Sequence, residues 1–546
     1  MSRESELLTR IQELETELKK VKKQKRYGLV WEDKPEDVVE RCKRELPVLE
    51  EDISRRIEAS EDDLTHILIE GDNYHALSVL AYTHEKKVDV IYIDPPYNTG
   101  NKDFTYNDNY VDKEDSFRHS KWLSFMSKRL EIAKTLLKDT GVIFISIDDN
   151  EQSQLKLLCD DIFVDNFVWT LVWKRRVSSG LADRRLSTDH EYILCYGKSW
   201  FTFEGIGKSF SGYKNSDNDS RWPWISDNLT VWMWRDLRPN QFYPLIDPIS
   251  GISYPPNPNR VWAYIPESMN RMISEKRIIF PSDPKKRPML KRFQNELKTD
   301  MNPVSSWLSD VGLNSEWSRD IQKIFGESNF QYAKPKSLIK YLINSSVKWW
   351  VILDFFAWSG TTWHAVLELN SEDGGKRQCI LVTNNENKIA EEVTYPRMRN
   401  VISWYADVVG IPANLRYYRT DFIWVEKSID DLRGKFMWRC TEMLCIRESC
   451  FSESSTPYPS RGESKRSEYF QVFENSDRYL AILYHPYEIE RLREFAEKSG
   501  TKEIVVYIFS MGVEIFEEEL AHLGDRIRIE TIPDEILETY KKIFGF

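Results

Sequence analysis

The sequence predicts an α/β protein whose main domain is a doubly wound, mostly parallel sheet. Short apolar runs typical of buried parallel strands alternate with helix-like stretches early in the chain and again after residue 327. An irregular segment rich in Pro, Asn, Ser, Asp and Trp separates these two parts. With 546 residues, of which 41% are hydrophobic and 30% charged, the chain can build the cores of three or four domains.

Residues 5–25 are predicted to form a helix, within an N-terminal segment assigned to residues 1–26. Its apolar residues are spaced four, three, four and three positions apart, which is the seam of a short coiled coil: Leu7, Ile11, Leu14, Leu18 and Val21. About three heptads are marginal in isolation, so we expect this helix to pack either on a partner subunit or on its own chain.

The first α/β half is assigned to residues 27–168. Apolar runs predict strands at Thr65–Glu70, Val88–Ile93 and Gly141–Ile147, and the clearest helix is Ser120–Lys138. Residues 169–326 lose this regularity and are assigned to an inserted domain of loops and small strands.

The α/β pattern returns in residues 327–427, where Val351–Ala357 and Gln378–Thr383 are strand-like and each precedes a helical stretch. Residues 428–546 are predicted to form a small separate α/β domain. Its expected elements are the strands Tyr479–Tyr484, Glu503–Phe509 and Arg526–Ile532 and the helix Tyr487–Lys498.

The charge balance is a weak guide to the partner of this chain. A net charge of −11 argues mildly against nucleic acid, but in a protein of several domains a local basic surface is what meets phosphates. Two basic stretches lie in the insert: Lys174, Arg175, Arg176, Arg184 and Arg185, and then Lys285, Lys286, Arg287, Lys291 and Arg292. Taken alone, each stretch is better explained as a solvated loop.

Membrane insertion and disulfide bonds are not expected. No apolar run approaches the length that spans a bilayer, and the N-terminus is charged. The seven cysteines are scattered except for Cys440, Cys445 and Cys450, whose five-residue step matches no common zinc pattern. We expect reduced thiols in a cytoplasmic protein.

The chemistry is predicted at Asp94-Pro95-Pro96-Tyr97, directly after the strand Val88–Ile93, because ligands bind at the carboxyl ends of strands in a doubly wound sheet. The prolines stiffen the turn, so the Asp94 carboxylate and the Pro95 carbonyl form a rigid pair of acceptors for the two N–H groups of an exocyclic amine. The amine nitrogen can then attack a sulfonium methyl group, and Tyr97 offers a face for a flipped base. No metal is required.

Taken alone, these four residues are about as often a simple strand-ending turn without chemistry as they are a catalytic motif. The longer run from Asp94 to Asn101 is far more specific and is typical of amino methyltransferases that act on adenine N6. Cytosine N4 is the alternative acceptor, although such enzymes more often begin the motif with serine. Cytosine C5 is excluded, because that chemistry needs a nucleophilic cysteine after proline and the sequence has no Pro-Cys pair.

Further segments make the chain resemble the modification subunits of type III restriction–modification systems. They are Tyr27–Glu32, Glu70–Tyr74, Arg118–Trp122, Ser146–Glu151, His190–Tyr192, Asp354–Ala357, Thr383–Asn387 and Glu391–Arg397. The resemblance spans roughly residues 27–425 and implies a methyltransferase that uses S-adenosylmethionine (SAM) to methylate adenine N6 in duplex DNA.

The order of the motifs resembles the permuted β class of this family, because Asp94 precedes the SAM motif at Asp354 by 260 residues. Strands from both halves must then join one circularly permuted, Rossmann-like sheet, and the insert is the natural target-recognition domain. The resemblance strengthens the expectation that basic residues of the insert contact DNA phosphates: Lys174, Arg175, Arg176, Lys285, Lys286 and Arg287.

The resemblance also implies a SAM site. Its expected residues are Asp72, Lys334, Asp354, Phe355, Ala357, Trp358, Ser359, Gly360, Thr361, Asn384 and Glu386. Asp72 is expected near the SAM adenine, and Asn384 or Glu386 near the ribose hydroxyls. The helix that starts near Thr361 is expected to point its N-terminus at the methionine carboxylate.

One residue departs from the family at the SAM turn. The family reads Phe-Ala-Gly-Ser-Gly-Thr-Thr there, and this chain has Trp358 in place of the first glycine. Glycine lets the backbone bend tightly and approach the ligand, so the indole is expected to fill space meant for SAM. One hypothesis is therefore a catalytically silent subunit that still recognises DNA.

A second hypothesis is that UGA encodes glycine in the source organism and has been translated as Trp. The chain has 19 Trp and 22 Gly, and 22 of 546 is about 4%, against about 7% in average proteins. Several Trp stand where glycine would be ordinary: Trp317, Trp349, Trp350, Trp358, Trp363 and Trp404. UGG codons at Trp358 and Trp363 would refute this hypothesis, whereas Trp31 and Trp122 match the family and are expected to be UGG.

The expected partners are duplex DNA and other subunits. The N-terminal heptads and family habit suggest a homodimer. The chain has no Walker-type phosphate loop or helicase motif, so a restriction (helicase–nuclease) subunit would have to supply any cleavage. A solitary methyltransferase is the alternative.

Overall fold

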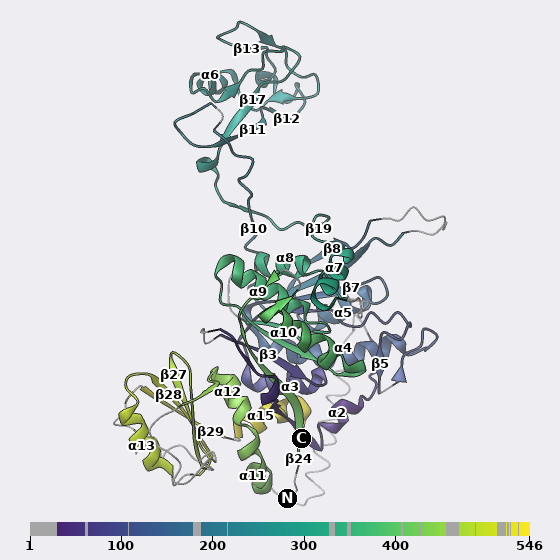
Figure 1. The fold of residues 1–546 in the computed structure, drawn as a ribbon. Coiled ribbons are helices and arrows are strands. Elements are labelled where there is room, and N and C mark those ends of the chain that lie inside the picture. The colour runs from purple at the N-terminus through teal and green to yellow at the C-terminus, as the bar shows by residue number, and fades with distance from the viewer. Residues whose placement is uncertain are drawn as a thin grey trace, which may run out of the picture. The chain divides into compact units, whose positions relative to one another are not determined.

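The computed structural model describes residues 30–545 except for short gaps at 61–63, 108, 178–186, 216, 327–332, 347–350, 406–407, 426–428, 455–468, 486–487, 510–519, 521–523, 525 and 533. The predicted N-terminal helix, Arg184, Arg185, Trp349 and Trp350 lie outside the described residues. The chain divides into two compact units, Met1–Phe203 with Ser305–Phe546, and Glu204–Val304 (Figure 1).

The larger unit is built on one eleven-stranded sheet. Its strand order is β1 (Glu45–Glu51), β24 (Asn414–Trp424), β3 (Thr65–Glu70), β21 (Gln378–Thr383), β20 (Val351–Asp354), β4 (Val88–Ile93), β7 (Leu137–Ile147), β9 (His190–Gly197), β8 (Phe167–Lys174) and β19 (Trp307–Leu308), with β2 (Ile57–Glu58) paired to β24. Every neighbouring pair from β24 to β7 is parallel, whereas β1 and β9 add antiparallel neighbours.

Strands from the two halves of the chain interleave in this sheet. β20, from the second half, pairs with β4, and β21 pairs with β3. The predicted circularly permuted, doubly wound sheet is therefore confirmed. Because these four strands are parallel, their carboxyl ends meet at one edge of the sheet, where ligands bind in folds of this type.

Helices cover both faces of the sheet. Side chains alternate along a strand, so Ile67 and Ile69 of β3 face one core and Leu68 faces the other. The first core also holds residues of α3 (Asn73–Thr83), α4 (Arg118–Leu136) and α5 (Gln152–Ile162), and the second holds residues of α8 (Lys336–Ser346), α9 (Thr361–Asp373) and α10 (Tyr395–Ser403).

Smaller elements connect these layers. They are α2 (Asp37–Arg41), η1 (Ile53–Arg55), the pair β5 (Thr105–Tyr106) and β6 (Asn109–Tyr110), α7 (Asn314–Phe325), η4 (Glu386–Lys388), the π-helix η5 (Ile389–Thr394) and the pair β22 (Trp404–Tyr405) and β23 (Val408–Val409). The predicted strand Val351–Ala357 is shorter than expected. It ends at Asp354, because the side chain of that residue accepts a hydrogen bond from the Phe356 backbone N–H and starts the turn to α9.

The C-terminal segment of the larger unit forms a second sheet. Its order is β25 (Ser452–Glu453), β26 (Phe470–Glu474), β27 (Arg478–Leu483), β28 (Glu503–Phe509) and β29 (Ile527–Ile532), with the helices α11 (Ile429–Arg439), α12 (Thr441–Glu448), α13 (Ile489–Lys498) and α15 (Asp534–Phe544). The predicted strands and helix agree with these bounds to within two residues. α12 and α15 contact α3, so this segment packs on the helical layer of the main sheet.

The smaller unit has its own core around Leu229, Tyr254, Trp262 and Met269. Its elements are the sheet β11 (Trp224–Asn228), β17 (Met289–Phe293) and β16 (Ile278–Ile279), the pairs β10 (Ile206–Gly207) with β18 (Met301–Asn302), β12 (Thr230–Val231) with β15 (Val261–Trp262) and β13 (Leu245–Ile246) with β14 (Ser253–Tyr254), and α6 (Pro266–Ser274), η2 (Pro239–Gln241) and η3 (Gln294–Glu296). This unit is shorter than the insert predicted at 169–326, since β8, β9 and α7 belong to the larger unit.

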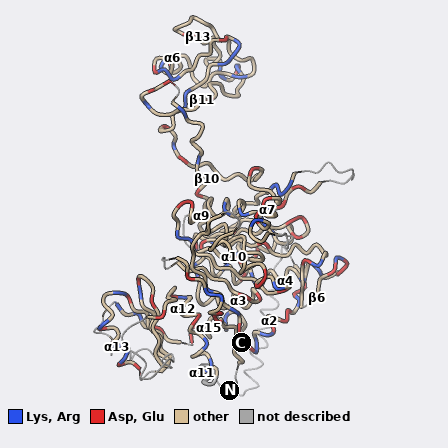
Figure 2. The backbone as a smooth tube through the Cα atoms, in the orientation of Figure 1, with Lys and Arg blue, Asp and Glu red and all other residues tan. Residues whose placement is uncertain are grey.

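Acidic and basic residues are interspersed along both units (Figure 2). None of the described helices is long and apolar enough to cross a membrane. All seven cysteines are buried and carry free thiols.

Candidate active site

Asp94–Tyr97 follow β4 at the carboxyl edge of the sheet, beside the end of β20. Neighbouring residues fix this segment. The Trp122 indole on α4 donates a hydrogen bond to the Pro96 carbonyl at 2.7 Å. Asn98 adopts a left-handed backbone conformation with φ 56°, and its amide donates to the buried Glu151 carboxylate at 2.6 Å. The predicted catalytic motif is thus held as a rigid turn.

A cluster of charges surrounds the Asp94 carboxylate. Lys334 Nζ lies 2.8 Å from both carboxylate oxygens of Asp94 and 2.7 Å from the Tyr97 hydroxyl. Glu191 Oε2, on β9, is 3.4 Å from the same Nζ and 3.2 Å from the Tyr97 hydroxyl. Glu191 Oε1 accepts a hydrogen bond from Arg175 at 2.9 Å. Two carboxylates therefore share one ammonium group beside the motif.

The charged states in this cluster depend on one another. Burial raises the pKa of Asp94, and the Lys334 ammonium offsets part of this effect. Burial lowers the pKa of Lys334, but the carboxylates of Asp94 and Glu191 outweigh it, so the pKa of Lys334 lies above its ordinary value. Burial also raises the pKa of the Tyr97 hydroxyl, which therefore stays protonated.

A cavity of about 180 Å³ lies beside the motif, at the carboxyl ends of β3, β20 and β21. Its lining includes the acidic residues Glu36, Asp37, Asp72, Asp103 and Glu386 and the aromatic residues Phe104, Tyr106, Phe125, Phe355, Phe356 and Trp358. Among the described residues that line it there is no Lys or Arg. This composition suits a cationic ligand that carries a flat ring and hydroxyl groups.

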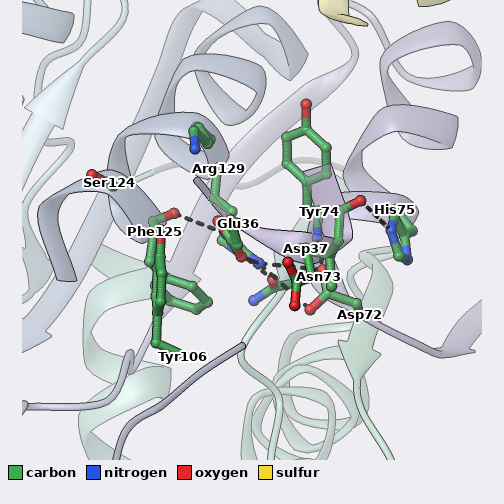
Figure 3. Close-up of polar contacts among 12 residues, drawn as sticks. Glu36, Asp37, Asp72, Asn73, Tyr74, His75, Tyr106, Ser124, Phe125 and Arg129 are labelled. Atoms are coloured by element: carbon green, nitrogen blue, oxygen red, sulfur yellow. Dashed lines mark hydrogen bonds and ion pairs between the residues drawn. The ribbon is translucent and has the colours of Figure 1, made fainter. Parts of the chain in front are cut away.

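Arg129 organises one side of this cavity (Figure 3). Its fully buried guanidinium donates to the two carboxylate oxygens of Glu36 at 2.7 and 3.1 Å and lies 3.3 Å from Asp72. Its Nε donates to Asn73 Oδ1, and the group stacks 3.7 Å above the ring of Phe125. One side chain of α4 thereby holds the segment before α2 and the turn after β3 in place.

Trp358 borders both this cavity and the catalytic motif. Its backbone is left-handed, with φ 44°, a conformation that favours glycine. Its indole Nε1 donates a hydrogen bond to the Asp94 main-chain carbonyl at 2.8 Å, and its side chain lines the cavity, which Asp94 does not. The indole therefore contacts the strand end at Asp94 from the cavity wall, and Pro96 of the motif lines the same cavity.

The rest of the predicted SAM turn is engaged in internal contacts. Arg397 Nη1 donates to Ser359 Oγ at 3.1 Å and to Thr361 Oγ1 at 2.8 Å. Asp354 accepts a hydrogen bond from Thr362 Oγ1 at 2.5 Å, and burial raises its pKa to about 7. Five residues assigned to the SAM site do not line the cavity: Asp354, Ala357, Ser359, Gly360 and Thr361.

The other residues expected to bind SAM fall into two groups, those that line the cavity and one that does not. Asp72, Phe355, Asn384 and Glu386 line the cavity. Lys334 does not line it, and its ammonium is at the Asp94 carboxylate instead.

Two residues of the first basic stretch are paired within the chain. Lys174 is the last residue of β8. Arg175 contacts Glu191 at 2.9 Å, and Arg176 contacts Asp189 at 3.2 Å. Arg175 therefore belongs to the charge cluster of the motif.

The second basic stretch lies in the smaller unit. Lys285, Lys286 and Arg287 are exposed. Lys291 and Arg292 instead form ion pairs with acidic residues of their own unit, Asp217 and Asp227.

Sequence reasoning missed several residues of the site. The sequence indicates no role for Glu36, Asn73, Phe125 or Arg129, because a lone residue on a helix or loop carries no motif. Glu191 lies in His190–Tyr192, a segment that resembles the family, but the sequence indicated no partner for it.

The fold and the site together define an amino-group methyltransferase with a permuted sheet. Residues 88–423 match the family model described as DNA methylase (N6_N4_Mtase), and the chain belongs to this family. The type III restriction-modification enzyme StyLTI Mod subunit of Salmonella typhimurium is 31% identical over 469 residues, which cover 77% of this chain and 71% of the relative. The predicted resemblance to type III modification subunits is therefore confirmed.

Further similar proteins include a methyltransferase and a solved methylase structure. The type II methyltransferase M.KpnI of Klebsiella pneumoniae is 34% identical over 352 residues, which cover 60% of this chain and 82% of the relative. A putative DNA modification methylase of Thermus thermophilus, solved in complex with S-adenosyl-L-methionine, aligns with a TM-score of 0.32 and 15% identity, covering 63% of this chain and 100% of that chain.

Proposed function

We propose that this chain is the modification subunit of a type III restriction–modification system and transfers a methyl group from SAM to adenine N6 in duplex DNA. The observation that carries the proposal is the rigid Asp94–Tyr97 turn at the carboxyl edge of the sheet, next to an acidic, aromatic cavity. SAM fits that cavity by charge, because its sulfonium and ammonium groups are cationic and its adenosine part offers a ring and hydroxyls. Asp at the first position of the motif favours adenine N6 over cytosine N4.

The residues of the motif have distinct roles in this proposal. The Asp94 carboxylate accepts a hydrogen bond from the target amine and takes up the proton that the nitrogen loses on methylation. Tyr97 provides a ring face for the extruded base, and its hydroxyl is fixed by Lys334 and Glu191. SAM supplies the electrophilic methyl group, so the chain needs only to align amine and donor.

Trp358 supports a second candidate, a catalytically silent DNA-recognition subunit. The acidic, aromatic cavity suits SAM by charge, but a bulky indole stands at the turn where the family has glycine, and it contacts both the cavity and Asp94. The backbone conformation of Trp358 agrees equally with the hypothesis that residue 358 is a glycine encoded by UGA. The two candidates differ in whether the natural gene product carries the indole.

The partners form part of the same proposal. The exposed residues Lys285, Lys286 and Arg287 of the smaller unit are the best candidates for phosphate contacts. A homodimer and a restriction subunit are proposed as assembly partners, by analogy with type III systems.

The test is methyl transfer by the Trp358→Gly protein. We expect it to incorporate tritiated methyl groups from SAM into duplex DNA, and nucleoside mass spectrometry should identify N6-methyladenine. Asp94→Ala in the same background should abolish incorporation while DNA binding persists, and Asp161→Ala, which removes an exposed carboxylate of α5, should change neither. Retained activity in Asp94→Ala would refute the catalytic assignment, and N4-methylcytosine as product would refute the choice of base.

A further inference from the structure

All three N–H donors of the Lys334 ammonium are engaged next to the catalytic motif, where the target amine is expected to bind. An ammonium group has three N–H donors. Two are directed at Asp94 Oδ1 and Oδ2, each at 2.8 Å, and the third meets the Tyr97 hydroxyl oxygen at 2.7 Å, with Glu191 at 3.4 Å. No donor remains for a carboxylate of SAM. Lys334 therefore has a role different from the SAM contact that the family resemblance implies.

The Asp94 carboxylate keeps capacity for the target amine while Lys334 is in place. An ionised carboxylate offers about four acceptor positions. Lys334 occupies two of them, and the single hydroxyl hydrogen of Tyr97 occupies at most one, since it can instead point to Glu191. At least one position is left for an amine N–H, so methyl transfer does not require Lys334 to leave.

The cluster is balanced in charge. Two carboxylates, Asp94 and Glu191, face two cations, Lys334 and Arg175. Arg175 contacts Oε1 of Glu191, on the side away from Asp94. Among the described residues, Lys334 is therefore the cation that balances the negative charge of Asp94. Among the described residues, further ionisable groups that act on this cluster include Tyr92, Asp148 and Asp354, none of which is a cation. Without Lys334, two carboxylates would share a buried site, where one of them takes up a proton.

We propose that Lys334 is a positioning residue of the acceptor site, and that its ammonium, shared by Asp94 and Glu191, keeps the Asp94 carboxylate ionised and oriented for the target amine. This inference rests on the proposed function of Asp94. In this proposal Glu191 is a second carboxylate, and its negative charge raises the pKa of Asp94 unless the Lys334 ammonium balances it.

The experiment compares Lys334→Met, Lys334→Arg and the double variant Lys334→Met with Glu191→Gln, all in the Trp358→Gly protein. Removing the ammonium should raise the pKa of Asp94, so its ionised form is lost at a higher pH as the solution is acidified. We expect the acid limb of kcat/KM to move up by about one to three pH units in Lys334→Met. Adding Glu191→Gln should move the acid limb of the pH profile back toward its position in the Trp358→Gly protein. Lys334→Arg should leave the position of that limb nearly unchanged.

A purely structural role would lower activity equally at every pH and would not be rescued by Glu191→Gln, and that result would overturn the proposal. Weaker SAM binding in Lys334→Met with an unchanged pH profile would overturn it too, because it would return Lys334 to the SAM site.

A second measurement does not depend on methyl transfer. In the protein with Trp358, carboxylates whose folded pKa is raised stabilise the fold at low pH, and that stability is lost as pH rises through the folded pKa. We therefore expect the Tm of Lys334→Met, relative to its parent, to fall as pH rises through the raised pKa of Asp94, and Glu191→Gln to flatten this dependence. A Tm difference that is independent of pH would overturn the proposed charge balance. If the Tm values follow the expected pattern but no variant transfers methyl groups, the proposed function is refuted and the proposed charge balance stands.

Discussion

Replacing Trp358 by glycine has two opposing effects on stability that can be estimated from the structure. The substitution relieves a left-handed backbone, which costs about 1–2 kcal/mol for a residue with a Cβ atom. It also removes the hydrogen bond to the Asp94 carbonyl, worth about 1 kcal/mol, and a half-buried indole, worth about 2.5 kcal/mol for roughly 100 Å² of apolar surface. We expect the glycine protein alone to be less stable by about 2 kcal/mol.

SAM should reverse this loss in the glycine protein only. A ligand present at about 100 times its Kd stabilises the fold by about 2.7 kcal/mol. The assay is thermal unfolding with and without SAM, supported by calorimetric titration. Trp404→Gly, which removes an indole that is 63% exposed and does not line the cavity, is the matched control and should not respond. Equal stabilisation of the Trp358 protein by SAM, or no response of the glycine protein, would refute the argument that the indole obstructs the donor site.

Two further predictions concern the cavity wall and the smaller unit. Arg129→Met should lower the free energy of unfolding by about 3–5 kcal/mol, because it leaves the buried carboxylate of Glu36 unpaired and also removes the ion pair with the partly exposed Asp72. Urea denaturation measures this, and a change below about 1 kcal/mol would contradict the estimate. The triple substitution of Lys285, Lys286 and Arg287 by Ala should reduce the slope of log affinity for duplex DNA against log salt by about 2.7, from about 0.9 per phosphate contact, as fluorescence anisotropy would show. An unchanged slope would place the phosphate contacts elsewhere.

The sequence predicts best what depends on local pattern. The strands β3, β4 and β21 are found where apolar runs place them, because a parallel strand buried on both faces leaves a continuous hydrophobic signal. The placement of Asp94–Tyr97 at a strand end follows from the same signal. The interleaving of the two halves followed from the order of motifs in the family, and not from any local feature.

Contacts between distant residues were beyond sequence reasoning. Lys334 and Asp94 are 240 residues apart, and only the path of the chain decides that the ammonium reaches the carboxylate. The insert predicted at residues 169–326 is wider than the compact unit Glu204–Val304 for a related reason. β8 and β9 extend the main sheet as antiparallel strands. The apolar run Phe167–Trp173 of β8 is half-exposed in the structure, and nothing in that run shows whether the strand joins the main sheet or the insert.

The backbone supports the hypothesis of a glycine encoded by UGA at one position, residue 358. Trp358 has the backbone conformation that a glycine would adopt freely. Trp363 and Trp317 lie within helices, where the backbone does not distinguish the two residues. The codon at position 358 is therefore the most informative one to read.

The interleaved sheet has a consequence for synthesis on the ribosome. Between the end of β4 at Ile93 and the start of its neighbour β20 at Val351, 257 residues must be translated. At about 5–20 residues per second this takes roughly 13–50 seconds. During that interval the nascent chain carries β3 and β4 without the strands that belong between them, so unpaired apolar edges are available to chaperones and to neighbouring nascent chains.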